Sequence, residues 1–235
     1  MSSATWKLRS DQMQMRARMT RSLSRLWPTL DFDRLDATYP GWAFSVEQMV
    51  RHYEQESMDR ALEYLDTLYA QRGVTRPTVE LPTIPAEQID AALHSKSVAA
   101  LKSATRVGKR YETALSSSFA ASSQAMVRLV RDSSRDTIRV TSLADDTFGG
   151  WRRIGTGTTC AFCTMLISRD AVYTEGSVRF ASHDNCNCEV EPADQSLRRD
   201  VDTYRQSDRT SKFDTEQKQA DKERVQQWLS VNLVG

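Results

Sequence analysis

All four cysteines of the chain lie between positions 160 and 188, in two short clusters. Cys160 and Cys163 form a C-x-x-C pair, and His183, Cys186 and Cys188 follow as an H-x-x-C-x-C cluster. Thiolate and imidazole groups in two turns at such a separation are typical ligands of one tetrahedral Zn²⁺ ion. The residue types and their spacing therefore predict a metal site in this stretch.

Five side chains compete for the four ligand positions of this site. Cys160 and Cys163 are the first choice, because a two-residue spacer lets both sulfurs reach one ion from a single turn. Cys186 and Cys188 would complete a Cys₄ site, whereas His183 with either of them would give Cys₃His. The fifth side chain would then support the ligands from outside. The sequence leaves these sets open.

The same cysteines allow three other interpretations. A small core with buried free thiols is the main alternative. A disulfide is disfavoured because we identify no signal peptide that would direct the chain to an oxidising compartment. A redox C-x-x-C pair is disfavoured because no βαβ pattern surrounds the motif.

The patterns of catalytic zinc enzymes are missing from the sequence. A zinc deaminase has H-x-E followed by P-C-x-x-C, but Thr159 precedes the pair, and Lys96 stands two residues after His94. The H-E-x-x-H of metalloproteases is also absent. We therefore expect a structural zinc ion and no enzymatic activity. A metal-dependent nuclease that uses His183 and Asp184 is the minor alternative.

Composition favours a soluble and mainly helical protein. The chain has 235 residues, of which 39% are hydrophobic and 27% charged, with a formal net charge of +1. No apolar run approaches the roughly 20 residues that span a bilayer. We expect a helical body over residues 1–147, with a basic N-terminal arm and a proline-rich connector at 74–85. A small α+β zinc-stabilised module over 148–193 and a charged helical tail over 194–235 would follow.

The N-terminal arm is predicted to be a helix over residues 5–27, which Pro28 ends. Its other faces are basic and could touch a phosphate backbone or an acidic protein surface. A solvated cationic face or a partly disordered arm is the alternative. The apolar positions at helical spacing are Met15, Met19, Leu23 and Leu26, and the basic ones are Lys7, Arg9, Arg16, Arg18, Arg21 and Arg25.

The next stretch is predicted to be a loop and then the strongest helix of the chain. Residues 31–41 should form the loop, since Tyr39-Pro40-Gly41 is typical of a turn. A helix should cover residues 45–72, with Ser45 and the glutamine three residues later as a capping box and Gly73 as its stop.

Three prolines exclude a helix from residues 75–85 and predict an extended connector. Helix should resume at Ala86 and continue as two or three helices to about residue 147, with a break near Val107 and Gly108. Four arginines at helical spacing should form a solvated, salt-bridged face, or alternatively face phosphate groups: Arg128, Arg131, Arg135 and Arg139.

Residues 148–192 are predicted to form a compact unit. Residues 148–154 should lead into a strand, 164–169 into a short helix or turn, and 171–173, 178–180 and 189–192 into short strands. So small a unit buries little apolar surface, and we expect a metal ion to supply its stability.

Residues 135–192 also carry an ordered set of motifs: G-W-R-R, C-x-F-C-x-M-L, S-R-x-x-V-Y, and H-D-x-C-x-C before a proline. Together they resemble the C-terminal region of MuF-like minor head (head morphogenesis) proteins of tailed bacteriophages, especially those that infect actinobacteria.

This resemblance implies a structural virion protein, present in few copies inside the phage head near the portal and assembled in the host cytoplasm. It would act in head assembly and in DNA packaging or delivery. The implied partners are the portal protein or the major capsid protein, with self-association and nonspecific DNA contact through basic helix faces as further expectations, and no membrane. A zinc-containing nucleic-acid-binding protein or nuclease is the alternative.

Overall fold

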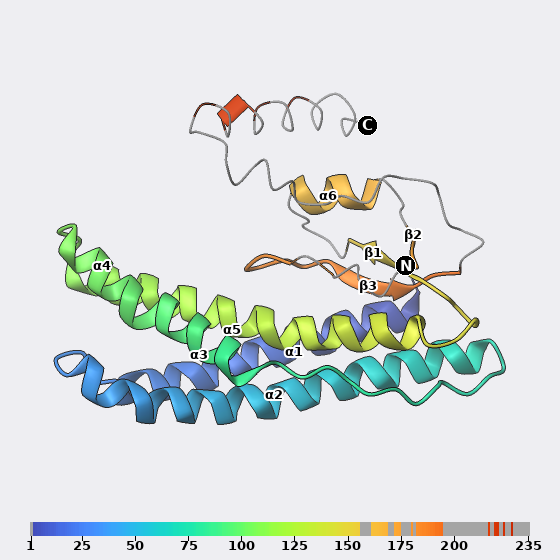
Figure 1. The fold of residues 1–235 in the computed structure, drawn as a ribbon, viewed down its shortest axis with the longest axis horizontal. Coiled ribbons are helices and arrows are strands. Elements are labelled where there is room, and N and C mark those ends of the chain that lie inside the picture. Colours follow the sequence, from blue (N-terminus) through green and yellow to red (C-terminus); the bar gives the residue numbers. More distant parts are fainter. Residues whose placement is uncertain are drawn as a thin grey trace.

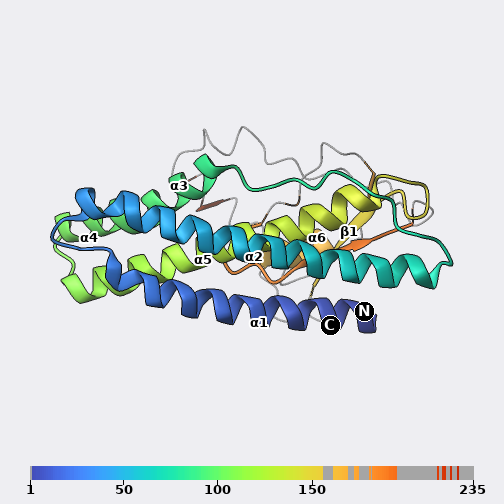
Figure 2. The same cartoon turned by 90° about the horizontal axis from the view of Figure 1, so that it is seen from below.

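Long helices make up most of the computed structural model (Figure 1). The structure describes residues 2–155, 161–168, 172–174, 180 and 182–194, together with Glu216, Gln219, Ala220, Glu223 and Gln227. Three long helices run side by side, and a small sheet with one short helix lies on them (Figures 1 and 2). The predicted mainly helical fold is confirmed.

The helical body begins with α1 (Ser3–Leu26), which confirms the predicted N-terminal helix. The Ser2 hydroxyl caps it by accepting a hydrogen bond from the Thr5 amide at 3.1 Å. The apolar side chains that recur at helical spacing, including Met15, Met19 and Leu23, are buried. A single 3₁₀ turn, η1 (Trp27–Thr29), contains Pro28 and ends the segment.

The loop predicted for residues 31–41 is confirmed over residues 31–34 but wrong over 35–41, because α2 (Leu35–Gln71) runs through Pro40 and Gly41. Proline removes one backbone donor, and this loss falls within the first two turns of the helix. The Trp42 ring meets the Trp27 ring edge-on at 5.6 Å, and the Tyr39 hydroxyl donates a hydrogen bond to Asp90 at 2.8 Å. Packing of the aromatic residues therefore outweighs the local turn signal.

The two ends predicted for this helix fare differently. Ser45 does not cap it, because its hydroxyl donates to the Gly41 carbonyl oxygen at 3.0 Å inside the helix. The stop at Gly73 is confirmed, with a φ of 72° that suits a residue without Cβ.

The extended connector is also confirmed, and a buried carboxylate fixes its end. Glu54 is 3% exposed and accepts a hydrogen bond from the Ile84 amide at 2.6 Å. Helices α3 (Ala86–His94), α4 (Ala100–Arg106) and α5 (Tyr111–Ser142) follow, with a π turn, η2 (Ser95–Ala99), between the first two. The predicted break lies at Gly108, whose φ is 77°.

The small sheet has three antiparallel strands in the order β2-β1-β3. They are β1 (Trp151–Ile154), β2 (Val172–Tyr173) and β3 (Glu189–Pro192), close to the predicted positions. The short helix α6 (Ala161–Ser168) begins earlier than expected. The predicted strand at 178–180 falls largely outside the described residues, and Phe180 belongs to no strand.

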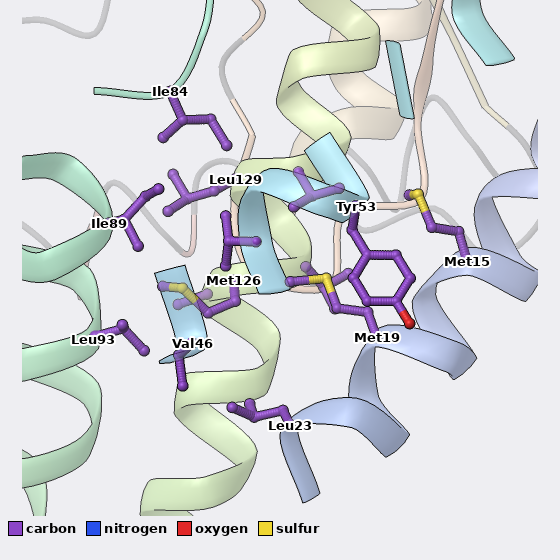
Figure 3. Close-up of a cluster of buried hydrophobic side chains, with 14 of the residues drawn as sticks. Met15, Met19, Leu23, Val46, Tyr53, Ile84, Ile89, Leu93, Met126 and Leu129 are labelled. Carbon is purple, nitrogen blue, oxygen red and sulfur yellow. The ribbon is translucent and has the colours of Figure 1, made fainter. Parts of the chain in front are cut away.

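Two clusters of buried side chains hold these elements together. The first joins α1, α2, α3 and α5 through side chains such as Met19, Val46, Leu93 and Met126 (Figure 3). The second joins Leu8, Leu65 and Ile138 of the long helices to Trp151 and Val190 of the sheet. The Cys-rich module therefore shares its hydrophobic core with the helical body.

The tail beyond residue 194 falls mostly outside the described residues. The five positions described there are helical, and all five are exposed. Within the part of the chain that the structure describes, we find no helix that is long and apolar enough to cross a membrane.

Two glycines give opposite expectations for substitution by alanine. A Cβ on Gly150 would lie 2.9 Å from Val172 Cγ1 and 3.1 Å from the Tyr173 carbonyl oxygen, so Gly150→Ala must displace the sheet. We expect a loss of about 1–3 kcal/mol in the free energy of unfolding. A Cβ on Gly41 would meet nothing within 4 Å.

The matched variant Gly41→Ala should stabilise the protein by about 0.5–1 kcal/mol, because alanine favours a helix interior. Urea denaturation followed by circular dichroism measures both free energies. Equal effects of the two substitutions would contradict the described packing around Gly150.

Candidate metal centre

Helix α6 and the loop before β3 bring three candidate ligands together. The ligand atoms of Cys163, His183 and Cys186 all lie within 4.8 Å of one another. The sulfurs of Cys163 and Cys186 are 3.6 Å apart. Two sulfurs at about 2.3 Å from a tetrahedral zinc ion would be about 3.8 Å apart, whereas a disulfide requires about 2.05 Å. The spacing fits two thiolates on one metal ion.

A tight turn places His183 next to Cys186. The Cys186 amide donates to the His183 carbonyl oxygen at 3.0 Å, and Asn185 between them has a φ of 66°. Asparagine tolerates this left-handed conformation better than most residues do. The ring Nδ1 of His183 donates to the Asp184 carbonyl oxygen at 2.7 Å, and this tautomer places the ring lone pair on Nε2. Such an arrangement is typical of metal-binding histidines.

Cys188 is buried as well, and it lies close enough to Cys163 and Cys186 to affect the pKa values of both thiols. No disulfide joins the three cysteines that the structure describes, Cys163, Cys186 and Cys188. Cys160, the fifth candidate, lies outside the described residues. Among the described residues, Cys163, His183 and Cys186 form the cluster that could hold a metal ion such as zinc, and Cys188 lies outside this group of three.

Hydrogen bonds among the thiols shift the pKa values of Cys163 and Cys186 in opposite directions. Hydrogen bonds from Cys163 and Cys188, together with the positive charge of Arg135, lower the pKa of Cys186. The hydrogen bonds of Cys163 with Cys186 and Cys188 raise the pKa of Cys163. In addition, an Arg153 Nη1 lies 3.5 Å from the Cys163 sulfur. Thiolate is the form of cysteine that binds metal ions, and nearby guanidinium groups favour it.

Two arginines of α5 hold the cysteine loop through its backbone. The Arg135 guanidinium donates to the carbonyl oxygens of Cys186 at 3.0 Å and Cys188 at 2.7 Å. Arg131 donates to the same Cys186 oxygen at 2.6 Å. Charge-assisted hydrogen bonds of this kind are roughly twice as strong as neutral ones. They fix the peptide groups on either side of the sulfur atoms.

Acidic side chains balance these two buried cations. Glu189 of β3 forms an ion pair with Arg131, and its other oxygen lies 3.7 Å from Arg135 Nε. Asp132 accepts from Arg135 at 2.7 Å and from the Ser182 hydroxyl at 2.6 Å. Burial raises the pKa of Asp132 despite the opposing effect of Arg135. We name this network, made of Arg131, Arg135, Asp132 and Glu189, the arginine clamp.

The solvated arginine face predicted for α5 is therefore wrong at Arg131 and Arg135. The side chains of these residues are 8% and 1% exposed. The spacing correctly predicted that the four arginines lie on one helix. It does not show that the cysteine loop covers Arg131 and Arg135. Arg128 pairs with Asp184 at 2.9 Å, and Arg139 with Asp136 at 3.0 Å. These guanidinium groups are thus already bound within the protein.

Sequence reasoning also missed Phe180 and Glu189 as parts of the site. The guanidinium carbons of Arg135 and Arg153 lie 4.7 and 3.7 Å from the centre of the Phe180 ring. Glu189 directly follows Cys188 in the sequence. Its position gives only a weak indication of a role in the site, because a buried carboxylate needs a cationic partner and the sequence does not show which arginines lie near it.

Comparison with known proteins places the chain in a family. The family model described as VG15 protein matches residues 2–214. The chain belongs to this family. It is a family of phage virion-gene proteins, so the chain is a phage protein, and this membership fits a protein associated with the virion. No curated protein and no solved structure matches the chain.

The arginine clamp predicts a large effect of Glu189→Gln on stability. The substitution keeps the size of the side chain but leaves Arg131 and Arg135 without their shared counter-charge. Breaking a buried ion pair from one side costs about 3–5 kcal/mol. Urea denaturation followed by tryptophan fluorescence should show a loss of this size in the free energy of unfolding.

Glu191→Gln is the matched control two residues along β3. Glu191 pairs with Arg152 at 2.6 Å, and the Arg152 side chain is 35% exposed, so water can replace the lost contact. We expect a loss of about 1 kcal/mol. Equal losses for the two variants would contradict the described clamp.

Proposed function

We propose that the chain is a noncatalytic minor head protein of the MuF-like type. In this role it lies inside the phage head at or near the portal and contacts the portal protein or the major capsid protein. It acts in head assembly and in DNA packaging or delivery. Its family membership and the ordered motifs of residues 135–192 support this proposal.

The observation that carries the proposal is the way α5 binds the Cys-rich loop. Arg131 and Arg135 reach the loop at its backbone carbonyl oxygens and are nearly excluded from solvent. A loop held in this manner has a structural role, because it connects the helices to the sheet. An open catalytic centre would instead leave cationic or acidic groups directed at a substrate.

We further propose that a structural zinc ion stabilises this loop, with four of the five candidate residues as ligands. The sulfurs of Cys163 and Cys186 are 3.6 Å apart, a separation that suits two ligands of one zinc ion. When bound, the ion would neutralise the thiolates that Arg135 and Arg153 now face. Four protein ligands would fill a tetrahedral shell and leave no position for a reactive water molecule.

The nuclease alternative receives less support from the surroundings of His183. The Asp184 carboxylate is paired with Arg128 at 2.9 Å and lies 3.9 Å from Lys96, so two cations face it. A general base would need this carboxylate directed at a substrate or a water molecule.

Metal analysis of the purified protein tests the zinc proposal. We expect about one zinc per chain by mass spectrometry of the native protein, in line with one four-ligand site. Cys163→Ser should lose the metal and unfold at lower urea, because the metal binds only the folded arrangement. Addition of a chelator to the wild type should produce the same shift, which separates metal loss from a packing defect. A folded wild-type protein free of metal would refute the proposal.

Analysis of phage particles tests the proposed role. Proteomics of purified particles should detect the chain at few copies per head, and cross-linking should connect it to the portal protein or the major capsid protein. A phage that lacks the gene should yield defective heads or particles that package or deliver DNA poorly. Absence of the chain from both mature particles and head precursors would contradict the role. Metal-dependent DNA cleavage that His183→Ala abolishes would favour the nuclease alternative.

A further inference from the structure

The turn between α4 and α5 is the most exposed part of the described helical body. Residues 105–113 are all exposed, and Val107 and Tyr111 reach 71% and 43% exposure. Gly108 has a φ of 77°, which turns the chain sharply between the two helices. Figure 1 shows the turn at one end of the long helices, away from the small sheet.

Three cationic side chains project from this turn: Arg106, Lys109 and Arg110. None of them forms a hydrogen bond or an ion pair through its side chain with any residue that the structure describes. Lys102, one turn earlier on α4, is by contrast held by Asp36 at 2.7 Å. The cations of the turn are therefore available to an external anion.

The neighbouring polar groups are those that usually contact phosphate. Tyr111, Thr113 and Ser117 are exposed on the first turns of α5 and carry hydroxyl groups. Arginine, lysine and hydroxyl side chains make most protein contacts to nucleic-acid phosphates. Glu112 is the acidic residue within the turn, and Asp31 and Asp33 lie close enough to affect the pKa of Tyr111. Asp31 is itself paired with Arg34 at 2.8 Å.

The composition of this surface favours nucleic acid over an acidic protein. A stable protein interface needs about 800 Å² on each partner and an apolar centre. The turn offers only Val107 and Tyr111 as large apolar side chains among the exposed ones. Contacts to a phosphate backbone need charge and hydroxyl groups without such a centre.

We propose that the α4–α5 turn binds the phosphate backbone of double-stranded DNA without sequence specificity, through Arg106, Lys109 and Arg110. The α5 arginines that could have served this purpose are bound in the arginine clamp or to neighbouring acids. The inference deepens the proposed function, because a head protein near the portal meets the packaged DNA. The DNA contact itself does not depend on the proposed head role, but its biological purpose does.

Fluorescence anisotropy with a labelled DNA duplex of mixed sequence tests the proposal on the full-length protein. Three phosphate contacts predict a slope of about −2.7 for the logarithm of the binding constant against that of the salt concentration. Affinity should thus fall about 40-fold between 50 and 200 mM salt. The variant with Arg106→Gln, Lys109→Gln and Arg110→Gln should reduce the slope by 2 or more, by the same relation of about 0.9 per contact.

The control variant carries Lys7→Gln, Arg9→Gln and Arg60→Gln. It removes the same number of positive charges near the other end of the helices, where Lys7 and Arg60 already pair with acids. Its slope should match that of the wild type. Circular dichroism should show that both variants are folded, because all the changed side chains lie at least partly in solvent.

Three results would overturn the proposal. The first is a wild-type protein that does not bind DNA at 50 mM salt, and the second is an equal loss in both variants, which would indicate diffuse charge. The third is a turn variant that keeps its DNA affinity but loses portal or capsid protein in a pull-down. A protein found in phage heads that fails the DNA assay would refute this inference and leave the head role standing.

Discussion

The arginine clamp is the interaction on which the rest of the structure depends. Two guanidinium groups are buried between α5 and the cysteine loop, and desolvation of such ions costs several kcal/mol each. This cost is offset only when the carbonyl oxygens of Cys186 and Cys188 and the carboxylate of Glu189 all stand in place. The helix, the loop and strand β3 must therefore form together. An isolated Cys-rich module would expose both the carbonyl groups and the apolar side chains that pack on Leu8, Leu65 and Ile138.

The clamp and the sulfur cluster share the same few peptide groups, so each constrains the other. The carbonyl oxygens that Arg135 binds belong to the residues whose sulfurs lie near Cys163. A metal ion would order the side chains of this loop while α5 orders its backbone, and the free energy of metal binding would then contribute to the docking of the module on the body. In the proposed zinc form, loss of the ion would loosen the contact between sheet and helices as well as the loop itself.

The sequence identified those features that local chemistry determines. Periodicity located α1 from Met15, Met19 and Leu23, and glycine identified the ends of α2 and α4 at Gly73 and Gly108. Pro40 misled because its cost is local, whereas the gain from Trp42 against Trp27 comes from another part of the chain. Arg131 and Arg135 misled for the same reason. Their spacing gave the correct helix face, but the loop that buries them follows more than 50 residues later, at Cys186 and Glu189. The sequence identified the cysteines as candidate metal ligands because the thiol group binds metal ions wherever the fold places it.

Helix α5 connects the two regions to which we assign different roles. Its 32 residues span about 48 Å, and the clamp at Arg131 lies about 30 Å from Tyr111 at the exposed turn. Between these points α5 packs against α1 and α2 through buried side chains such as Met126 and Val130, and no proline or glycine interrupts it. A load applied to the turn by DNA would consequently reach the Cys-rich module through a continuous helix. The force would pass from the helix to the sheet at the arginine clamp. The free energy of an apolar contact depends little on direction, whereas carbonyl oxygens fixed by two guanidinium groups resist sliding. This difference gives a physical reason for burying charges at that position.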